Sequence, residues 1–171
     1  MKCGQWMTGT ATTSSRVAAA LCLGLLLSAC GSRAGGKELS GQGSCDLITP
    51  GELSGVLGGV FGAGEREGAQ CLFASGGGPL PRVSISSGIR TTTQPTGVGV
   101  HAKVENTEVD GVAAEQISTR PRGSSCVIDV LLVPEDSGQV FSVTFNGTSD
   151  GEESCASAKK VASAILGKLQ G

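Results

Sequence analysis

The stretch that decides the fold runs from Cys126 to Phe145 and reads CVIDVLLVPEDSGQVFSVTF. Apolar residues occupy alternate positions from Cys126 to Leu132, and again from Phe141 to Phe145. Such alternation is typical of strands with one buried face, and the Pro-Glu-Asp-Ser-Gly sequence at 134–138 is a turn signal. The two runs therefore predict an antiparallel hairpin.

Helices with favourable capping sequences are expected at both ends of the domain. Asp150-Gly-Glu-Glu begins one helix as a D-x-x-E capping box, and an apolar stripe follows from Cys155 to Leu169. Nearer the N-terminus, Thr-Pro-Gly-Glu at 49–52 combines a T-x-x-E box with proline at the first helical position. This second helix is short, because two glycines follow at 58–59.

Further strands are expected between these helices. Segments rich in β-branched or alternating residues predict strands at 71–74, 82–86 and 112–117. The segment 101–104 is expected to be a short helix or strand, and the Gly-rich stretch 60–68 a loop. The order of elements predicts an α+β domain, an antiparallel sheet with a short N-terminal helix and a C-terminal amphipathic helix packed on one face.

The N-terminal segment carries an export signal. An 11-residue apolar run, Val17–Leu27, follows Arg16, and the sequence Leu-Ser-Ala-Cys ends at Cys30. A positive flank, a short apolar run and small residues before a cysteine are typical of a lipoprotein signal peptide, here residues 1–29. The run is too short for a transmembrane anchor, which needs about 20 apolar residues. A signal peptide without lipidation is the other alternative, but it would not require the Leu-Ser-Ala-Cys order.

Cleavage before Cys30 implies a protein that is lipidated on this cysteine and anchored to the outer face of the cytoplasmic membrane. We expect residues 30–44 to be the lipidated cysteine and a flexible tether, and residues 45–171 to be a single disulfide-stabilised domain. Lys2 and Arg16 leave with the leader, whereas all 15 acidic residues remain, so the mature chain is net acidic. Its remaining aromatic residues are four phenylalanines. An acidic chain of this composition is not expected to bind nucleic acid, nor to be attracted electrostatically to an anionic bilayer.

Four cysteines remain for the folded domain, namely Cys45, Cys71, Cys126 and Cys155. An even number in an exported chain predicts two disulfides, and three pairings are open. None of these cysteines has a partner at C-x-x-C spacing, so neither a redox motif nor a zinc site is expected. The sequence indicates no metal and no cofactor.

Few residues are candidates for chemistry. His101 is the only histidine and has no nucleophile motif beside it, so a surface position is the better interpretation. The glycines between 55 and 64 follow a helix and lack the Gly-Lys-Ser/Thr sequence of a phosphate-binding loop. Two acidic groups are interpreted as solvated carboxylates, namely Glu65 with Glu67, and Glu105 with Glu108 and Asp110. The segment Arg120–Gly123 is interpreted as a basic turn, and Asn146–Thr148 as an unused glycosylation sequon. The sequence predicts no catalytic residue and no enzyme.

The cysteines and their neighbours resemble a known family. The chain is similar to the actinobacterial lipoproteins of the domain of unknown function 3558 family, with its pattern C-x-L-L-T-P-x-E-L, C-x-W/F, Gly-x-x-Ala, C-x-V-x-V and a Cys-x-x-Ala helix. Phe73 stands where the family often has tryptophan, a difference that affects packing alone. The matching stretches cover nearly all of the mature domain and are CDLITPGEL at 45–53, CLF at 71–73, VDGVAA at 109–114, CVIDV at 126–130 and SCASAKKVA at 154–162.

The resemblance implies the envelope of a high-GC Gram-positive bacterium and implies no activity. Within this four-cysteine framework, order along the chain pairs Cys45 with Cys71 and Cys126 with Cys155. Each pair would then join the start of a helix to a strand.

We expect a non-enzymatic, lipid-anchored module that binds an envelope protein, or a small or lipidic ligand in a cleft between helices and sheet. A purely structural or protein-interaction module without a ligand site is the alternative, and a hydrolase is the least favoured function. A deep apolar cavity would favour a ligand carrier, whereas a filled core with a flat surface patch would favour a protein partner.

Overall fold

The computed structural model of the chain describes residues 37–78, 80–89, 102–119, 125–132, 138–147 and 150–169, which belong to one unit spanning residues 34–171. Its elements, in chain order, are the 3-10 helix η1 (Ser44–Asp46), α1 (Pro50–Leu57), β1 (Glu65–Glu67), β2 (Gln70–Ala74), β3 (Arg82–Ile89), β4 (Ala102–Val109), β5 (Val112–Thr119), β6 (Ser125–Leu131), β7 (Gln139–Asn146) and α2 (Gly151–Leu166).

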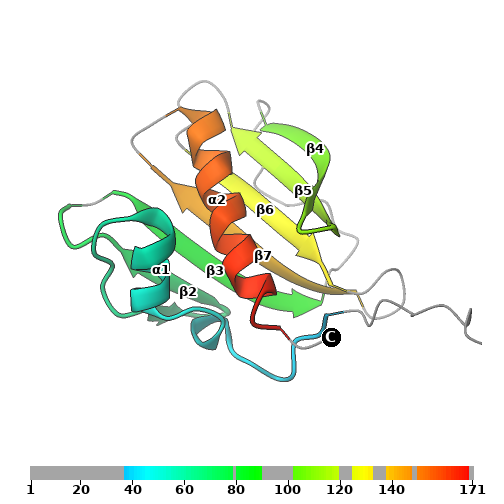
Figure 1. Ribbon diagram of the computed structural model, residues 1–171, viewed down its shortest axis with the longest axis horizontal. Coiled ribbons are helices and arrows are strands. Elements are labelled where there is room, and N and C mark those ends of the chain that lie inside the picture. Colours follow the sequence, from blue (N-terminus) through cyan, green and yellow to red (C-terminus); the bar gives the residue numbers. More distant parts are fainter. Residues whose placement is uncertain are drawn as a thin grey trace, which may run out of the picture. The chain divides into compact units, whose positions relative to one another are not determined.

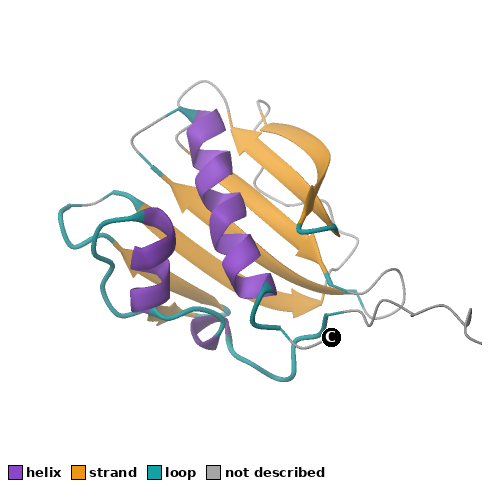
Figure 2. Cartoon of the chain, in the orientation of Figure 1, coloured by secondary structure: helices purple, strands orange, loops and turns teal. Residues whose placement is uncertain are grey.

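Seven strands form one antiparallel sheet in the order β1-β2-β3-β7-β6-β5-β4. β7 lies in the centre, paired with β3 on one side and with β6 on the other. The β6–β7 pair is the hairpin predicted from the alternating runs, with Cys126 opposite Phe145 and Val130 opposite Phe141. Both α-helices, the short α1 and the longer α2, lie over the same face of the sheet (Figure 1, Figure 2). The predicted α+β fold is therefore confirmed.

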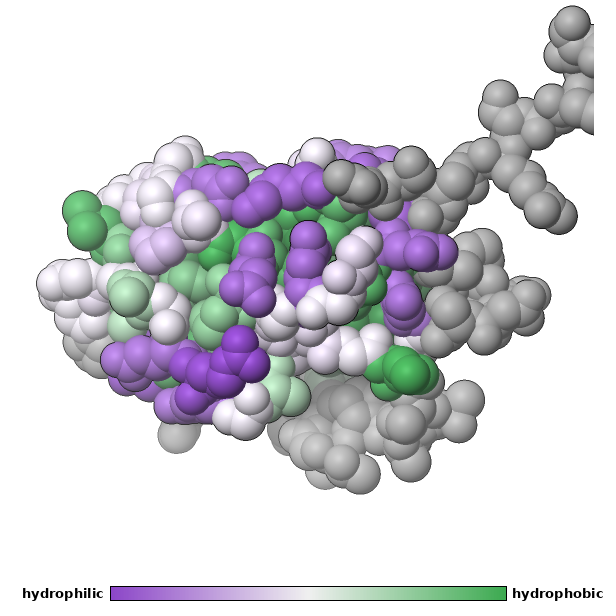
Figure 3. Space-filling model, turned by 90° about the horizontal axis from the view of Figure 1, so that it is seen from below, coloured by the Kyte–Doolittle hydropathy of each residue, from purple (hydrophilic) through white to green (hydrophobic). Residues whose placement is uncertain are grey.

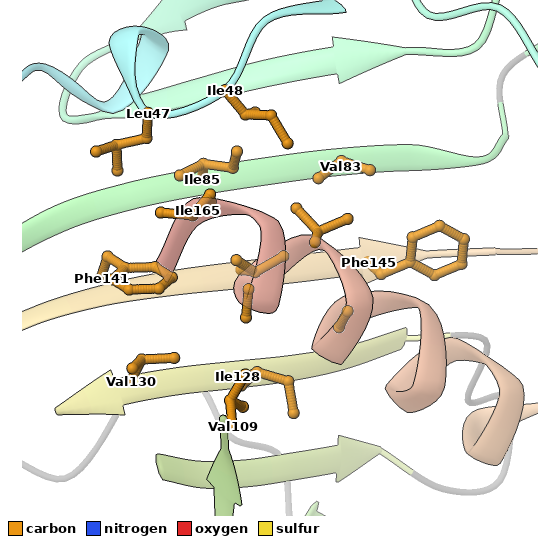
Figure 4. Close-up of a cluster of buried hydrophobic side chains, with 14 of the residues drawn as sticks. Leu47, Ile48, Val83, Ile85, Val109, Ile128, Val130, Phe141, Phe145 and Ile165 are labelled. Atoms are coloured by element: carbon orange, nitrogen blue, oxygen red, sulfur yellow. The ribbon is translucent and has the colours of Figure 1, made fainter. Parts of the chain in front are cut away.

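The core lies between this face of the sheet and the helices. Every second side chain of β6 and β7 is buried, as the alternation predicts. α2 presents a matching apolar stripe, because residues three and four apart share one side of a helix. Figure 4 shows the buried side chains of β3, β7 and β6 on the side of the sheet that α2 covers. No helix among the described residues is long and apolar enough to cross a membrane.

Local sequence fixes the ends of these elements. Thr49 Oγ1 accepts a hydrogen bond from the Glu52 N–H at 3.3 Å, and Glu52 Oε2 accepts one from the Thr49 N–H at 2.7 Å. This is the predicted capping box of α1. Asp150 caps α2 by accepting two backbone N–H bonds from its first turn. Between β4 and β5, Asp110 and Gly111 have φ values of 50° and 78°, which a two-residue hairpin turn of this type requires.

Three segments differ from the sequence predictions. Residues 60–68, expected as a loop, include β1, a three-residue edge strand whose Glu-Arg-Glu sequence has no alternating signal. The segment 101–104 is extended from Ala102 onward, so the strand alternative is correct and the helix is wrong. Residues 37–44, expected to belong to the flexible tether, contact the domain and include the first residue of η1.

Candidate functional site

Several residues singled out in the sequence lie outside the described part of the chain. They include the expected lipidation site Cys30, the lone His101 and the basic segment Arg120–Gly123. Asn146 ends β7, and Thr148 of the same sequon is outside the described residues. The structure therefore bears on the domain cysteines, the glycines after α1 and the carboxylates of β1 and β4.

Both pairs of domain cysteines form disulfides. Cys45 in η1 is bonded to Cys71 in β2, and Cys126 in β6 is bonded to Cys155 in α2, each with a Cα–Cα distance of 5.0 Å. These are the pairs that order along the chain predicts. Each bridge fastens a helical element to the sheet, and a bridge that closes a loop of this length contributes on the order of 2–4 kcal/mol.

The glycines between 55 and 64 serve the backbone and the packing of the core. A Cβ atom on Gly64 would lie 2.5 Å from Cys71 Sγ and 2.8 Å from the Phe73 ring, so no side chain fits there. Gly58 and Gly59, which follow α1, have φ values of 75° and 81°, where glycine is favoured. Neither role is that of a phosphate-binding loop.

The acidic candidates of β4 do not form a paired carboxylate site. Glu105 pairs with Lys103 at 2.7 Å, whereas Glu108, three residues later, points to the opposite face of the strand. The Asp110 carboxylate accepts a hydrogen bond from Ser163 Oγ of α2 at 2.6 Å and so holds the β4–β5 turn against the helix. Within the described ranges, no group of three or more His, Cys, Asp or Glu side chains is placed to hold a metal ion.

The other acidic pair, Glu65 and Glu67, lies on the edge strand β1, where both residues are exposed. Charged side chains on a short edge strand discourage pairing with other chains. This position supports the interpretation of these residues as solvated carboxylates.

The segment before η1 is docked onto the domain. Lys37 Nζ donates hydrogen bonds to the carbonyl oxygens of Leu166 and Leu169 at 2.7 and 3.1 Å, at the C-terminal end of α2. The Leu39 N–H donates to Gln139 Oε1 at 2.9 Å, and the Leu39 side chain packs against the core. An ammonium group at this position satisfies carbonyl groups without intrahelical partners and interacts favourably with the helix dipole. Residues from Lys37 onward are therefore not part of the tether.

The face of the sheet turned away from α1 and α2, here called the open face, has hydroxyl groups at its centre. Ser84 of β3 lies opposite Thr144 of β7, and Ser86 lies opposite Ser142. All four residues are half-buried, and Ser84 Oγ donates a hydrogen bond to Gln70 Oε1 of β2 at 3.0 Å. Because side chains alternate along each strand, these residues share the face opposite the core.

Apolar and acidic residues extend the open face toward β4. Val127 of β6 lies opposite Ile117 of β5, which lies opposite Val104 of β4. Ile117 is only 6% exposed although it is not part of the main core cluster, and Val104 is 55% exposed. The register also places Glu115 opposite Asp129 on this face. The open face thus combines a hydroxyl centre, an apolar row and an acidic pair, none of which was singled out in the sequence.

The space between the helices and the sheet is filled by large side chains. Leu53 of α1, Ile165 of α2, and Phe73 and Phe141 of the sheet are each less than 2% exposed. Figure 4 shows part of this packing around Ile165 and Phe141. A ligand in a cleft between helices and sheet would have to occupy the volume that these side chains already fill.

A charged pair links the two helices. Lys168 Nζ lies 2.8 Å from Glu52 Oε2, so the end of α2 is tied to the first turn of α1. The hydrogen bond from Lys168, together with those from the Thr49 backbone and side chain, lowers the pKa of the Glu52 carboxyl to about 2. Both side chains are about 40% exposed. Their hydrogen bonds cap the start of α1 and tie it to the residues that follow α2.

Comparison of the chain with protein-family models, with curated proteins and with solved structures finds no match. The family resemblance therefore rests on the cysteine framework and its neighbouring residues alone. What the chain binds has to be inferred from its own surface.

Proposed function

We propose that the chain is a lipid-anchored extracytoplasmic lipoprotein of the actinobacterial domain of unknown function 3558 family, and that its domain is a non-enzymatic module for an envelope protein. The signal peptide of residues 1–29, followed directly by Cys30, supports export and lipidation. The two disulfides support an oxidising compartment, because such bonds persist outside the cytoplasm.

The observation that carries the binding role is the composition of the open face. Its hydroxyl centre, represented by Ser84 and Thr144, lies beside the apolar row of Val127, Ile117 and Val104. Mixed polar and apolar surfaces of this kind are typical of non-obligate protein interfaces. A broad sheet face suits a protein partner, whereas small ligands are usually held in concave, mostly apolar pockets.

The filled interior supports the same choice. A carrier of a small or lipidic ligand needs an apolar volume that the protein itself leaves open. Here the large side chains of Leu53, Phe73, Phe141 and Ile165 occupy the space between helices and sheet. The protein-partner function is therefore favoured over ligand carriage.

Photocrosslinking from the open face tests this function. A p-benzoylphenylalanine at Thr144 should crosslink one defined envelope protein in the exporting bacterium, because Thr144 lies at the centre of the open face. The same residue at Lys160, exposed on the outer side of α2, is the matched control and should not form this crosslink. Ser84→Arg places a bulky charge beside Thr144 and should abolish the product while the melting temperature stays close to that of the parent.

Two results would contradict the proposal. The first is equal crosslinking from Thr144 and Lys160, and the second is a Thr144 crosslink that Ser84→Arg leaves unchanged. Native mass spectrometry of the oxidised domain adds an independent measurement. A small-molecule adduct that survives gentle ionisation and leaves on denaturation would favour a ligand carrier instead.

A further inference from the structure

We infer that the docked segment before η1 orients the domain on the membrane, with Ile89 contacting the lipid bilayer. This inference rests on the proposed lipid anchor at Cys30. It adds to that proposal a second membrane contact, made by a residue of the folded domain, and a defined direction for the sheet.

One end of the domain is identified by the docked segment. Leu39 is hydrogen-bonded to Gln139 at the start of β7, and Lys37 is bonded to the C-terminal carbonyl groups of α2. Ile89, the last residue of β3, lies directly opposite Gln139 in the sheet. The end of β3, the start of β7 and the end of α2 therefore lie together (Figure 1), and we call this the docked end.

The covalent chain keeps the docked end close to the lipid. Seven residue steps separate Cys30 from Lys37, and they span about 25 Å at full extension. The eight residues of β3 are themselves about 26 Å long, and the 16 residues of α2 about 24 Å. If the opposite end faced the bilayer, the residues between Cys30 and Lys37 would have to reach along the whole length of the domain to the docked end. Even fully extended, they would only just span that distance. With the docked end toward the bilayer, the same chain has length to spare.

An exposed apolar residue lies at this same end. The side chain of Ile89 is 73% exposed, one of the most exposed large hydrophobic residues of the described chain. Insertion between lipid headgroups would remove its apolar surface from water, in addition to the anchoring by the acyl chains. Figure 3 views the domain from below, the side on which the docked end lies in Figure 1, and shows hydrophobic residues among hydrophilic ones. Because the mature chain is acidic, this contact is apolar rather than electrostatic.

The orientation determines what the domain presents to its surroundings. Strands β3 and β7 are antiparallel, with the end of β3 and the start of β7 at the docked end. Both strands therefore stand across the direction of the membrane plane, so the open face points sideways, along the membrane. A partner anchored in or standing on the same membrane would meet this face directly. Val60 marks the opposite end, because its carbonyl oxygen accepts a hydrogen bond from the Gly76 N–H after β2, at 2.9 Å.

Val60 supplies a matched control for the test, because it is 74% exposed and Ile89 is 73% exposed. The full-length chain is expressed in an exporting bacterium with p-benzoylphenylalanine at one of the two positions, and the membranes are irradiated. Phospholipid adducts are then counted by mass spectrometry of the modified peptide. We expect at least a fivefold excess of adducts at position 89, and equal adducts at the two positions would overturn the orientation.

The intact mass of the same samples separates this inference from the proposed function. An acylated protein with equal adducts at positions 89 and 60 refutes the orientation alone. A protein without acyl groups refutes the lipid anchor, and the orientation with it. Inserting about 20 Gly and Ser residues before Lys37 lengthens the reach of the tether and should bring the adduct ratio toward one. A ratio unchanged by the insertion would overturn the role of the short connection.

Discussion

Replacing Lys37 with methionine removes an ammonium group from the end of α2 while keeping most of the side chain. This group donates to the carbonyl oxygens of Leu166 and Leu169 at 2.7 and 3.1 Å. A hydrogen bond to a charged group contributes about 1.5–3 kcal/mol, and a cation at a helix C-terminus about 0.3–2 kcal/mol. These contributions overlap, and docking costs the lysine about 1–2 kcal/mol of side-chain freedom. The net loss should therefore be about 1–2 kcal/mol.

Urea unfolding of the oxidised domain measures this loss directly, and a thermal melt should show a decrease of about 3–10 °C. Lys160→Met is the matched control, because it removes the same charge from an exposed position on α2. It should change the free energy of unfolding by less than about 0.5 kcal/mol. Equal effects of the two substitutions would refute the reasoning and would mean that water satisfies the terminal carbonyl groups equally well.

Acid should destabilise the domain through Glu52, because folding lowers the pKa of this carboxyl to about 2. The stabilisation that the ionised Glu52 contributes is complete above about pH 5 and is lost as the pH falls toward 2. In melts across this range, Glu52→Gln should flatten the decline. Cys126→Ser should lower the free energy of unfolding by about 2–4 kcal/mol, and unchanged calorimetric melting would argue against a structural bridge. Gly64→Ala should destabilise by about 1–3 kcal/mol, because its Cβ would lie 2.5 Å from a disulfide sulfur. Gly55→Ala, in the open within α1, should stabilise by about 0.5–1 kcal/mol in the same urea titration. Cys30→Ala should move the protein from the membrane fraction to the medium, and firm retention would refute lipidation.

Local patterns made much of the fold predictable. The alternation from Cys126 to Phe145 gave the central hairpin because each strand has one face on the core and one face away from it. The capping sequences at Thr49 and Asp150 placed the starts of both helices, since a cap acts on residues only two or three positions away.

Features that depend on distant parts of the chain were not predictable in the same way. The docked segment has the composition of a polar tether because its partners are far away in the sequence, with Leu166 lying 129 positions after Lys37. The hydroxyl centre of the open face was equally hidden. Ser84 and Thr144 are far apart in the sequence and come together only because β3 pairs with β7. That strand order does not follow from local sequence patterns.

The central position of β7 has a consequence for the order of folding. β1–β2–β3 and β4–β5–β6 are three-stranded halves, and only β7 joins them. Pairings such as that of Val83 with Phe145 are highly non-local, and contacts of this kind slow folding because a long loop must close first. The sheet therefore becomes continuous only after residues 139–146 are available to both halves. If the chain is exported unfolded, as the proposed lipoprotein signal requires, such an arrangement keeps it unfolded for longer, and the sheet is completed after the crossing.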